Sequence, residues 1–221
     1  IEGGANVTIV AGCGIHNAGC DAARHDGIHA FHVGKGATVT YAEKHYGEGE
    51  GTGEKILNPV TQIYLEEDAV FNLDSAQIGG VDSTVRKTEV TLAENAKLNV
   101  MEKLMTHDKQ TAVSDMTVEL NGAGSTARII SRSVAKGTSV QTFHPIAVGN
   151  ALCHAHVQCD SIIMDQAQIS SIPEINARNI DAQIIHEAAI GRINNDQILK
   201  LRTFGLTEEE AEAVIIEDFL A

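Results

Sequence analysis

Cysteine and histidine residues gather in two segments of the 221-residue sequence, one near each end. Thiolates are the preferred ligands of iron–sulfur units, and imidazole can replace a thiolate at one iron. None of the four cysteines forms a C-x-x-C pair, and no common zinc spacing fits them. The two segments suggest soft-metal or sulfur chemistry, although inert core cysteines would also explain them. The first segment contains Cys13, His16, Cys20, His25, His29 and His32, and the second contains Cys153, His154, His156, Cys159, His186 and Glu187.

The second segment begins with a predicted β-strand, because polar and apolar residues alternate from residue 152 to residue 160. Alternation places Cys153 and Cys159 on one face with apolar residues, and His154 and His156 on the other. On spacing alone, core cysteines and solvated surface histidines explain this pattern best. The roles of Cys20, Cys153, His154 and His156 therefore stay open.

An internal repeat must position these residues. Five similar segments each place a small residue after a polar or glycine turn and before a strand of period two. They recur at 27 to 32 residues, and no helical period fits between them before about residue 190. Stacked strand-rich coils of this length indicate a β-helix, whereas a β-sandwich would not require such a repeat. The markers are Ala5, Ala37, Ala69, Ala96 and Ala123, with a weaker sixth copy at 135–140.

The pattern changes near Asn194, so we expect a β-helix core over 1–193 and a helical segment over 194–221. A short helix is predicted over 194–202, ended by Gly205. Thr207 and Glu210 have capping-box spacing, which predicts a second helix over about 208–218. Its expected apolar face consists of Ala211, Val214, Ile215 and Phe219. By itself, such a segment would cap the end of the solenoid.

Composition excludes several function classes. A net charge of −14 disfavours binding to nucleic acid, and no apolar run is long enough to span a membrane. Four cysteines without a disulfide pattern suggest a reducing, cytoplasmic location. Few aromatic residues and no tryptophan argue against a β-helix polysaccharide-active enzyme. Neither a P-loop nor a G-x-S-x-G elbow is present.

Several segments of the sequence resemble the SufB/SufD family, the scaffold subunits of the SUF iron–sulfur cluster assembly machinery. Ile172-Pro173-Glu174 with Arg178-Asn179 is similar to the SufD branch, and His186-Glu187 is similar to the SufB branch. Members of this family pair as SufB–SufD heterodimers, so a chain with both traits is expected to form either a homodimer or a SufB–SufD-type heterodimer. The other resembling pieces are Gly12-Cys13, Gln158 to Ser161, Ile185 to Ile193 and Gly205 to Ala211.

The resemblance implies a right-handed parallel β-helix with a short C-terminal helical segment that docks a SufC-like ABC-type ATPase. It implies that Cys159, His186 and Glu187 hold the iron of a transient iron–sulfur cluster, and that no cluster stays bound in air. It also implies that Cys13 accepts sulfur from a donor protein. The expected function is that of a non-catalytic scaffold. The alternatives are a structural β-solenoid, a SufD-like partner subunit without its own cluster, or the polysaccharide-active enzyme.

Overall fold

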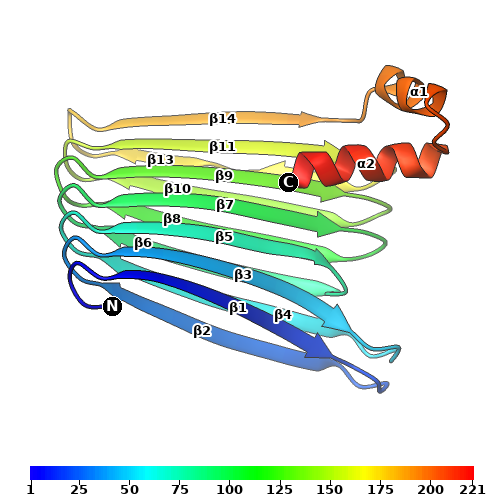
Figure 1. The fold of residues 1–221 in the computed structure, drawn as a ribbon, viewed down its shortest axis with the longest axis horizontal. Helices are drawn as coiled ribbons and strands as arrows, with labels where there is room; N and C mark the ends of the chain where they lie inside the picture. Colours follow the sequence, from blue (N-terminus) through cyan, green and yellow to red (C-terminus); the bar gives the residue numbers. More distant parts are fainter.

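The computed structural model, which describes residues 1–221, is a stack of parallel β-strands with two helices at its C-terminal end (Figure 1). The first sheet contains β1 (Asn6–His16), β3 (Thr38–Glu48), β5 (Val70–Gly79), β7 (Lys97–Thr106), β9 (Thr126–Ala135), β11 (His154–Ile163) and β14 (Gln183–Gly191). The second contains β2 (Ala23–Val33), β4 (Lys55–Leu65), β6 (Ser83–Leu92), β8 (Thr111–Leu120), β10 (Val140–Gly149), β12 (Gln168–Ser171) and β13 (Glu174–Ala177). The helices are α1 (Asn195–Thr203) and α2 (Glu208–Leu220).

The chain forms a coil: up to β12, consecutive strands lie alternately in the first and the second sheet. The first sheet runs in the order β1-β3-β5-β7-β9-β11-β14, and the second runs β12-β10-β8-β6-β4-β2 with β13 also paired to β10. Every pairing between strands is parallel. Each turn of the coil thus adds one strand to each sheet, and the predicted mainly-β parallel β-helix is confirmed.

A small residue precedes the first strand of each layer, as the repeat predicts, but the predicted position was wrong in one layer. Ala37, Ala69 and Ala96 are fully buried just before their strands. In the next layer the register gives this position to Ser125, not Ala123, and Ser125 is also fully buried. The prediction failed because this layer is two residues longer than the alanine spacing implied. The segment 135–140 lies at the other end of the strands, where it connects β9 to β10.

Cys153 occupies the same marker position one layer further on. In each layer, the backbone N–H of the first strand residue donates a hydrogen bond to the carbonyl of the small turn residue in the layer before. The His154 N–H donates to the Ser125 carbonyl in this way. Gln183 likewise bonds the Cys153 carbonyl. Strands in a sheet lie about 4.8 Å apart, so successive layers leave little room for a large side chain at this turn. Cys153 is therefore explained as a small buried residue of the turn.

The interior between the sheets is apolar along most of its length. Twenty-five buried residues form one cluster that runs through the layers from Phe31 to Cys159. Phe31, Tyr41 and Phe71 make tilted and edge-to-face ring contacts near its N-terminal end. Buried positions alternate with more exposed ones along most of the strands, as the burial pattern of β7 shows.

Both predicted helices are present. Asn194 caps α1 and Gly205 follows it with a φ of 98°. Thr207 and Glu210 form the predicted capping box at the start of α2. The buried face of α2 differs from the prediction at Val214, which is 45% exposed, because Ile216 and Leu220 are the residues that pack against Val134 and Met164 at the end of the solenoid. Neither helix has the length and apolar character that a membrane crossing requires.

The capping box gives a direct test of the tail. We expect Thr207→Ala to destabilise α2 by about 1 kcal/mol, because it removes the acceptor for the Glu210 N–H. Hydrogen exchange of the α2 amides should accelerate, while the strand amides stay unchanged. Thr52→Ala is the matched control, since Thr52 lies in an exposed turn. Unchanged exchange in α2 would contradict the assigned role of the cap.

Candidate functional site

Cys159 and His186 meet on the inner face of the last layers of the solenoid. Cys159 lies on β11, and His186 lies on the neighbouring strand β14, opposite Val157. The two side chains are thus diagonal neighbours, and Cys159 Sγ lies 3.3 Å from His186 Nε2. The structure thus places these two residues side by side, and their role as cluster ligands stays a prediction.

Burial controls the protonation of this pair. Burial raises the pKa of Cys159 to about 11, with a smaller opposing effect from the nearby Ser171 hydroxyl. Burial also lowers the pKa of His186. Near neutral pH the pair is therefore a thiol beside a neutral imidazole, and a metal must displace the thiol proton to bind.

The structure does not bring Glu187 to Cys159. Strand alternation turns Glu187 to the outer face, where it opposes Gln158 and its side chain is 65% exposed. One of its oxygens lies 3.4 Å from His156 Nε2. The expectation of a three-residue ligand set within one chain thus reduces to Cys159 and His186, with Glu187 and His156 on the opposite face.

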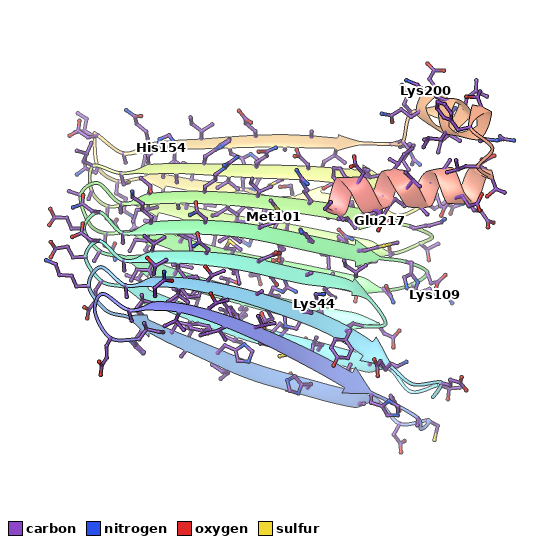
Figure 2. The ribbon with its side chains drawn as sticks, in the orientation of Figure 1. Lys44, Met101, Lys109, His154, Lys200 and Glu217 are labelled. Carbon is purple, nitrogen blue, oxygen red and sulfur yellow. The ribbon has the colours of Figure 1, made fainter.

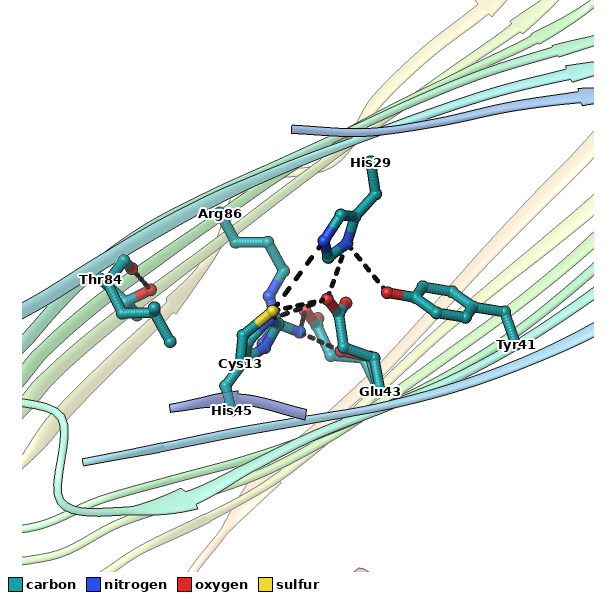
Figure 3. Close-up of polar contacts among 10 residues, drawn as sticks. Cys13, His29, Tyr41, Glu43, His45, Thr84 and Arg86 are labelled. Atoms are coloured by element: carbon teal, nitrogen blue, oxygen red, sulfur yellow. Dashed lines mark hydrogen bonds and ion pairs between the residues drawn. The ribbon is translucent and has the colours of Figure 1, made fainter. Parts of the chain in front are cut away.

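A second cluster surrounds Cys13 near the other end of the solenoid (Figure 3). Cys13 Sγ lies 3.7 Å from Glu43 Oε1 and 4.0 Å from His29 Nε2. His29 comes from β2 in the second sheet, whereas Cys13 and Glu43 come from β1 and β3 in the first. Burial, and then the negative charge of Glu43, raise the pKa of the Cys13 thiol. A nearby cation would favour the thiolate instead.

Behind Glu43, His45 and Arg86 fix the charges of the interior. Arg86 can only donate, so its Nη2, 2.8 Å from His45 Nδ1, makes that nitrogen an acceptor. His45 is therefore neutral with its proton on Nε2, which lies 3.1 Å from Glu43 Oε1. Burial alone would raise the Glu43 pKa, but the contacts with His45 and Tyr41 and the charge of Arg86 lower it to about 2. Glu43 is thus a buried carboxylate.

Polar side chains continue from Arg86 through the interior to Cys159. Arg86 Nη1 lies 2.9 Å from Glu102 Oε1, and both side chains are at least 93% buried. Ser131 donates to the other oxygen of Glu102 at 3.3 Å. Ser131 is also the register partner of Cys159, and a small cavity borders Glu102, Ser131 and Cys159. We call this run of residues the interior polar track; its members in order are Cys13, Glu43, His45, Arg86, Glu102, Ser131 and Cys159.

A family comparison now bears on this arrangement. Residues 1–219 match the model of the SUF system FeS cluster assembly, SufBD core domain. The chain belongs to the SufBD family. The match covers both Cys13 and the Cys159–His186 pair.

Curated relatives carry the same family name. An iron–sulfur cluster assembly SufBD family protein of Methanothermobacter thermautotrophicus is 28% identical over the whole of this chain and 53% of its own length. One from Pyrococcus horikoshii is 30% identical over 89% of this chain and 60% of its own length. One from Methanocaldococcus jannaschii is 28% identical over 85% of this chain and 60% of its own length. The chain thus spans about half to three-fifths of these SufBD relatives.

In this SufBD chain, only part of the first cysteine–histidine segment converges. Cys13 and His29 face one another, but His16, Cys20 and His25 are exposed. Sequence reasoning missed Glu43, His45, Arg86 and Glu102. The available signal was a charged residue at an inward position of a strand: Glu102 follows Leu98 and Val100 in the buried phase of β7.

Proposed function

We propose that this chain is a non-catalytic scaffold for iron–sulfur cluster assembly and that Cys159 and His186 hold the nascent cluster. The observation that carries the proposal is the 3.3 Å contact between these two side chains at one end of the interior polar track. A thiolate and a neutral imidazole are both iron ligands. A set with only one thiolate suits a cluster that must later be released.

Cys13, at the other end of the track, is proposed to accept sulfur from a donor protein. Its thiolate attacks the outer sulfur of a donor persulfide, the new S–S bond forms on Cys13, and the donor thiolate leaves. Five strand spacings separate the layer of Cys13 from that of Cys159, or about 24 Å. Direct exchange between the two thiols cannot cover this distance. A thiol reductant would release the outer sulfur from Cys13 as hydrosulfide, itself becoming a disulfide, and would regenerate the Cys13 thiolate. The track of polar groups supports passage of this hydrosulfide through the interior.

The C-terminal helices are proposed to dock a SufC-like ABC-type ATPase. Apolar side chains remain uncovered on them: Leu199 is 62% exposed, Phe204 73% and Val214 45%. Acidic residues such as Glu217 line α2 beside these positions, and Lys200 lies on α1 (Figure 2). Exposed apolar residues amid charged ones are typical of a protein interface.

If the ATPase docks on the C-terminal helices, removal of an exposed apolar side chain there should weaken its binding. Phe204→Ser should weaken the binding of a SufC-like ATPase by about tenfold or more, since exposed aromatic anchors commonly contribute at least 1.4 kcal/mol to an interface. Titration calorimetry with the purified ATPase would measure the change. Val10→Ser removes an equally exposed apolar side chain from β1, far from the helices, and should leave the affinity unchanged. Equal affinities of the wild type and Phe204→Ser would place the ATPase elsewhere.

A second chain of this family is proposed to pair at the other exposed feature of this end, the edge strand β14. No strand follows β14 in its sheet, and Ile185 and Ile190 on it are 47% and 45% exposed. An uncovered apolar edge strand favours pairing with a further strand. A homodimer would bring the outer-face residue Glu187 close to the subunit boundary.

The proposal is tested by anaerobic reconstitution of the chain with Fe²⁺ and sulfide, followed by visible spectroscopy and iron and sulfide assay. A sulfide-to-iron charge-transfer band that weakens strongly in His186→Ala and only slightly in Glu187→Gln would support the proposed ligand pair. A larger loss in Glu187→Gln would move the cluster to the outer face. No chromophore in a folded protein would instead favour a SufD-like subunit without a cluster of its own.

A further inference from the structure

The residues around Cys13 form a ligand set for a metal ion, separate from the Cys159–His186 pair. One ligand atom from each of Cys13, His29 and Glu43 lies within 4.8 Å of the other two. Thiolate, imidazole and carboxylate are the three ligand types of protein zinc sites, and they also bind iron. From these residues we infer a second metal site, which takes a single divalent transition-metal ion such as Zn²⁺ or Fe²⁺.

The distances between the ligand atoms are close to those of a tetrahedral site. Ordinary bond lengths to zinc place a sulfur and a nitrogen ligand about 3.6 Å apart. Cys13 Sγ and His29 Nε2 are 4.0 Å apart, and Cys13 Sγ and Glu43 Oε1 are 3.7 Å apart. Glu43 Oε1 lies 3.0 Å from His29 Nδ1, so closing the site requires the carboxylate to turn from Nδ1 toward Nε2 and the cysteine to move slightly inward.

A second shell already orients the histidine. The Tyr41 hydroxyl lies 2.9 Å from His29 Nδ1, and Glu43 Oε1 lies 3.0 Å from the same nitrogen. The other ring nitrogen, Nε2, faces the cysteine. Metal-ligating histidines almost always engage their other ring nitrogen in such a contact, which fixes the orientation of the ring. Tyr41 is 1% exposed and packs against Phe31, so its hydroxyl is held in place by the core.

The charge of the surrounding interior also favours a cation. Glu43 and Glu102 are buried carboxylates, and Arg86 is the buried guanidinium between them. His45 is neutral because Arg86 donates to it. One negative charge thus remains next to Cys13, and a divalent ion would balance both this carboxylate and the Cys13 thiolate. Solvent reaches the set through His29, whose side chain is 31% exposed.

This inference does not rest on the proposed cluster or on sulfur transfer, because it uses neither Cys159 nor a persulfide. An ion on Cys13 would occupy the thiolate proposed to accept sulfur. The two uses of Cys13 would then exclude one another at any moment.

The test is an anaerobic titration of the chelator-treated chain with Co²⁺, followed by thiolate-to-cobalt absorption and then by competition with Zn²⁺. We expect saturable binding in the wild type, loss of this absorption in Cys13→Ser, and at least about tenfold weaker binding in His29→Gln and in the second-shell variant Tyr41→Phe. Cys20→Ser is the matched control, because it removes an exposed cysteine of the same segment, and it should bind as the wild type does. Circular dichroism verifies that each variant is folded.

Cys159→Ser separates this site from the cluster. It should bind Co²⁺ as the wild type does, even where it loses the cluster chromophore. Thiolate-to-cobalt absorption that survives in Cys13→Ser and disappears in Cys159→Ser would overturn the inference without touching the cluster proposal. Absence of the absorption in the wild type would also overturn it.

Discussion

Replacement of Cys159 by serine is expected to abolish the iron–sulfur chromophore that forms on anaerobic reconstitution with Fe²⁺ and sulfide. Cys159 supplies the only thiolate at this site, and His186 alone offers a single ligand. Loss of an outer-shell partner already weakens a metal site by about 10- to 100-fold, so loss of a ligand should cost more. Bound iron and charge-transfer absorbance per chain should therefore fall by more than about tenfold.

Cys153→Ser is the matched control for this prediction. Cys153 is buried just before β11, and it fills the turn position that serine already fills in the previous layer, at Ser125. The exchange should leave both stability and reconstitution unchanged. If Cys153→Ser lost the cluster and Cys159→Ser kept it, the cluster would have to bind near the turn. If neither variant changed the absorbance, the ligands would have to come from another part of the surface.

The solenoid was predictable because its constraint is local and repeated. Each layer needs a small residue at the turn and an alternating strand after it, and both are visible in one sequence. The exact repeat length was not predictable where it changes. Ala123 has the right residue type, but Gly122 and Gly124 around it belong to the turn, and the buried position is Ser125.

The candidate site was predictable only in part. The resemblance indicated Cys159 and His186, but alternation alone would have shown that His186 and Glu187 face opposite ways on one strand. The Arg86–Glu102 pair could not be found from spacing. Arg86 lies on β6 and Glu102 on β7, so they belong to different sheets. Their side chains come into contact only when the two sheets pack against each other. A charged residue in an inward phase indicates a buried partner, but it does not identify that partner.

The second large effect concerns this buried pair. Glu102→Ala should destabilise the fold by about 3–5 kcal/mol, because it leaves the Arg86 guanidinium buried without its carboxylate. Ser114 and Ser131 would lose their shared acceptor as well. Denaturant unfolding measures the loss, and Glu119→Ala on the outer face of β8 provides the control, with an expected change within about 0.5 kcal/mol.

The double variant Arg86→Met with Glu102→Leu decides whether the pair serves stability or chemistry. Removing both charges together should recover most of the stability lost in Glu102→Ala, since apolar replacement of a buried ion pair is often neutral or better. The same variant interrupts the interior polar track between Cys13 and Cys159. If the track carries sulfur, this folded variant should still form a cluster from free sulfide but fail to form one from a persulfide donor. Equal yields from both sulfur sources would show that the pair contributes only to the fold, and a double variant as unstable as Glu102→Ala would show that its hydrogen bonds, rather than its charges, hold the interior together.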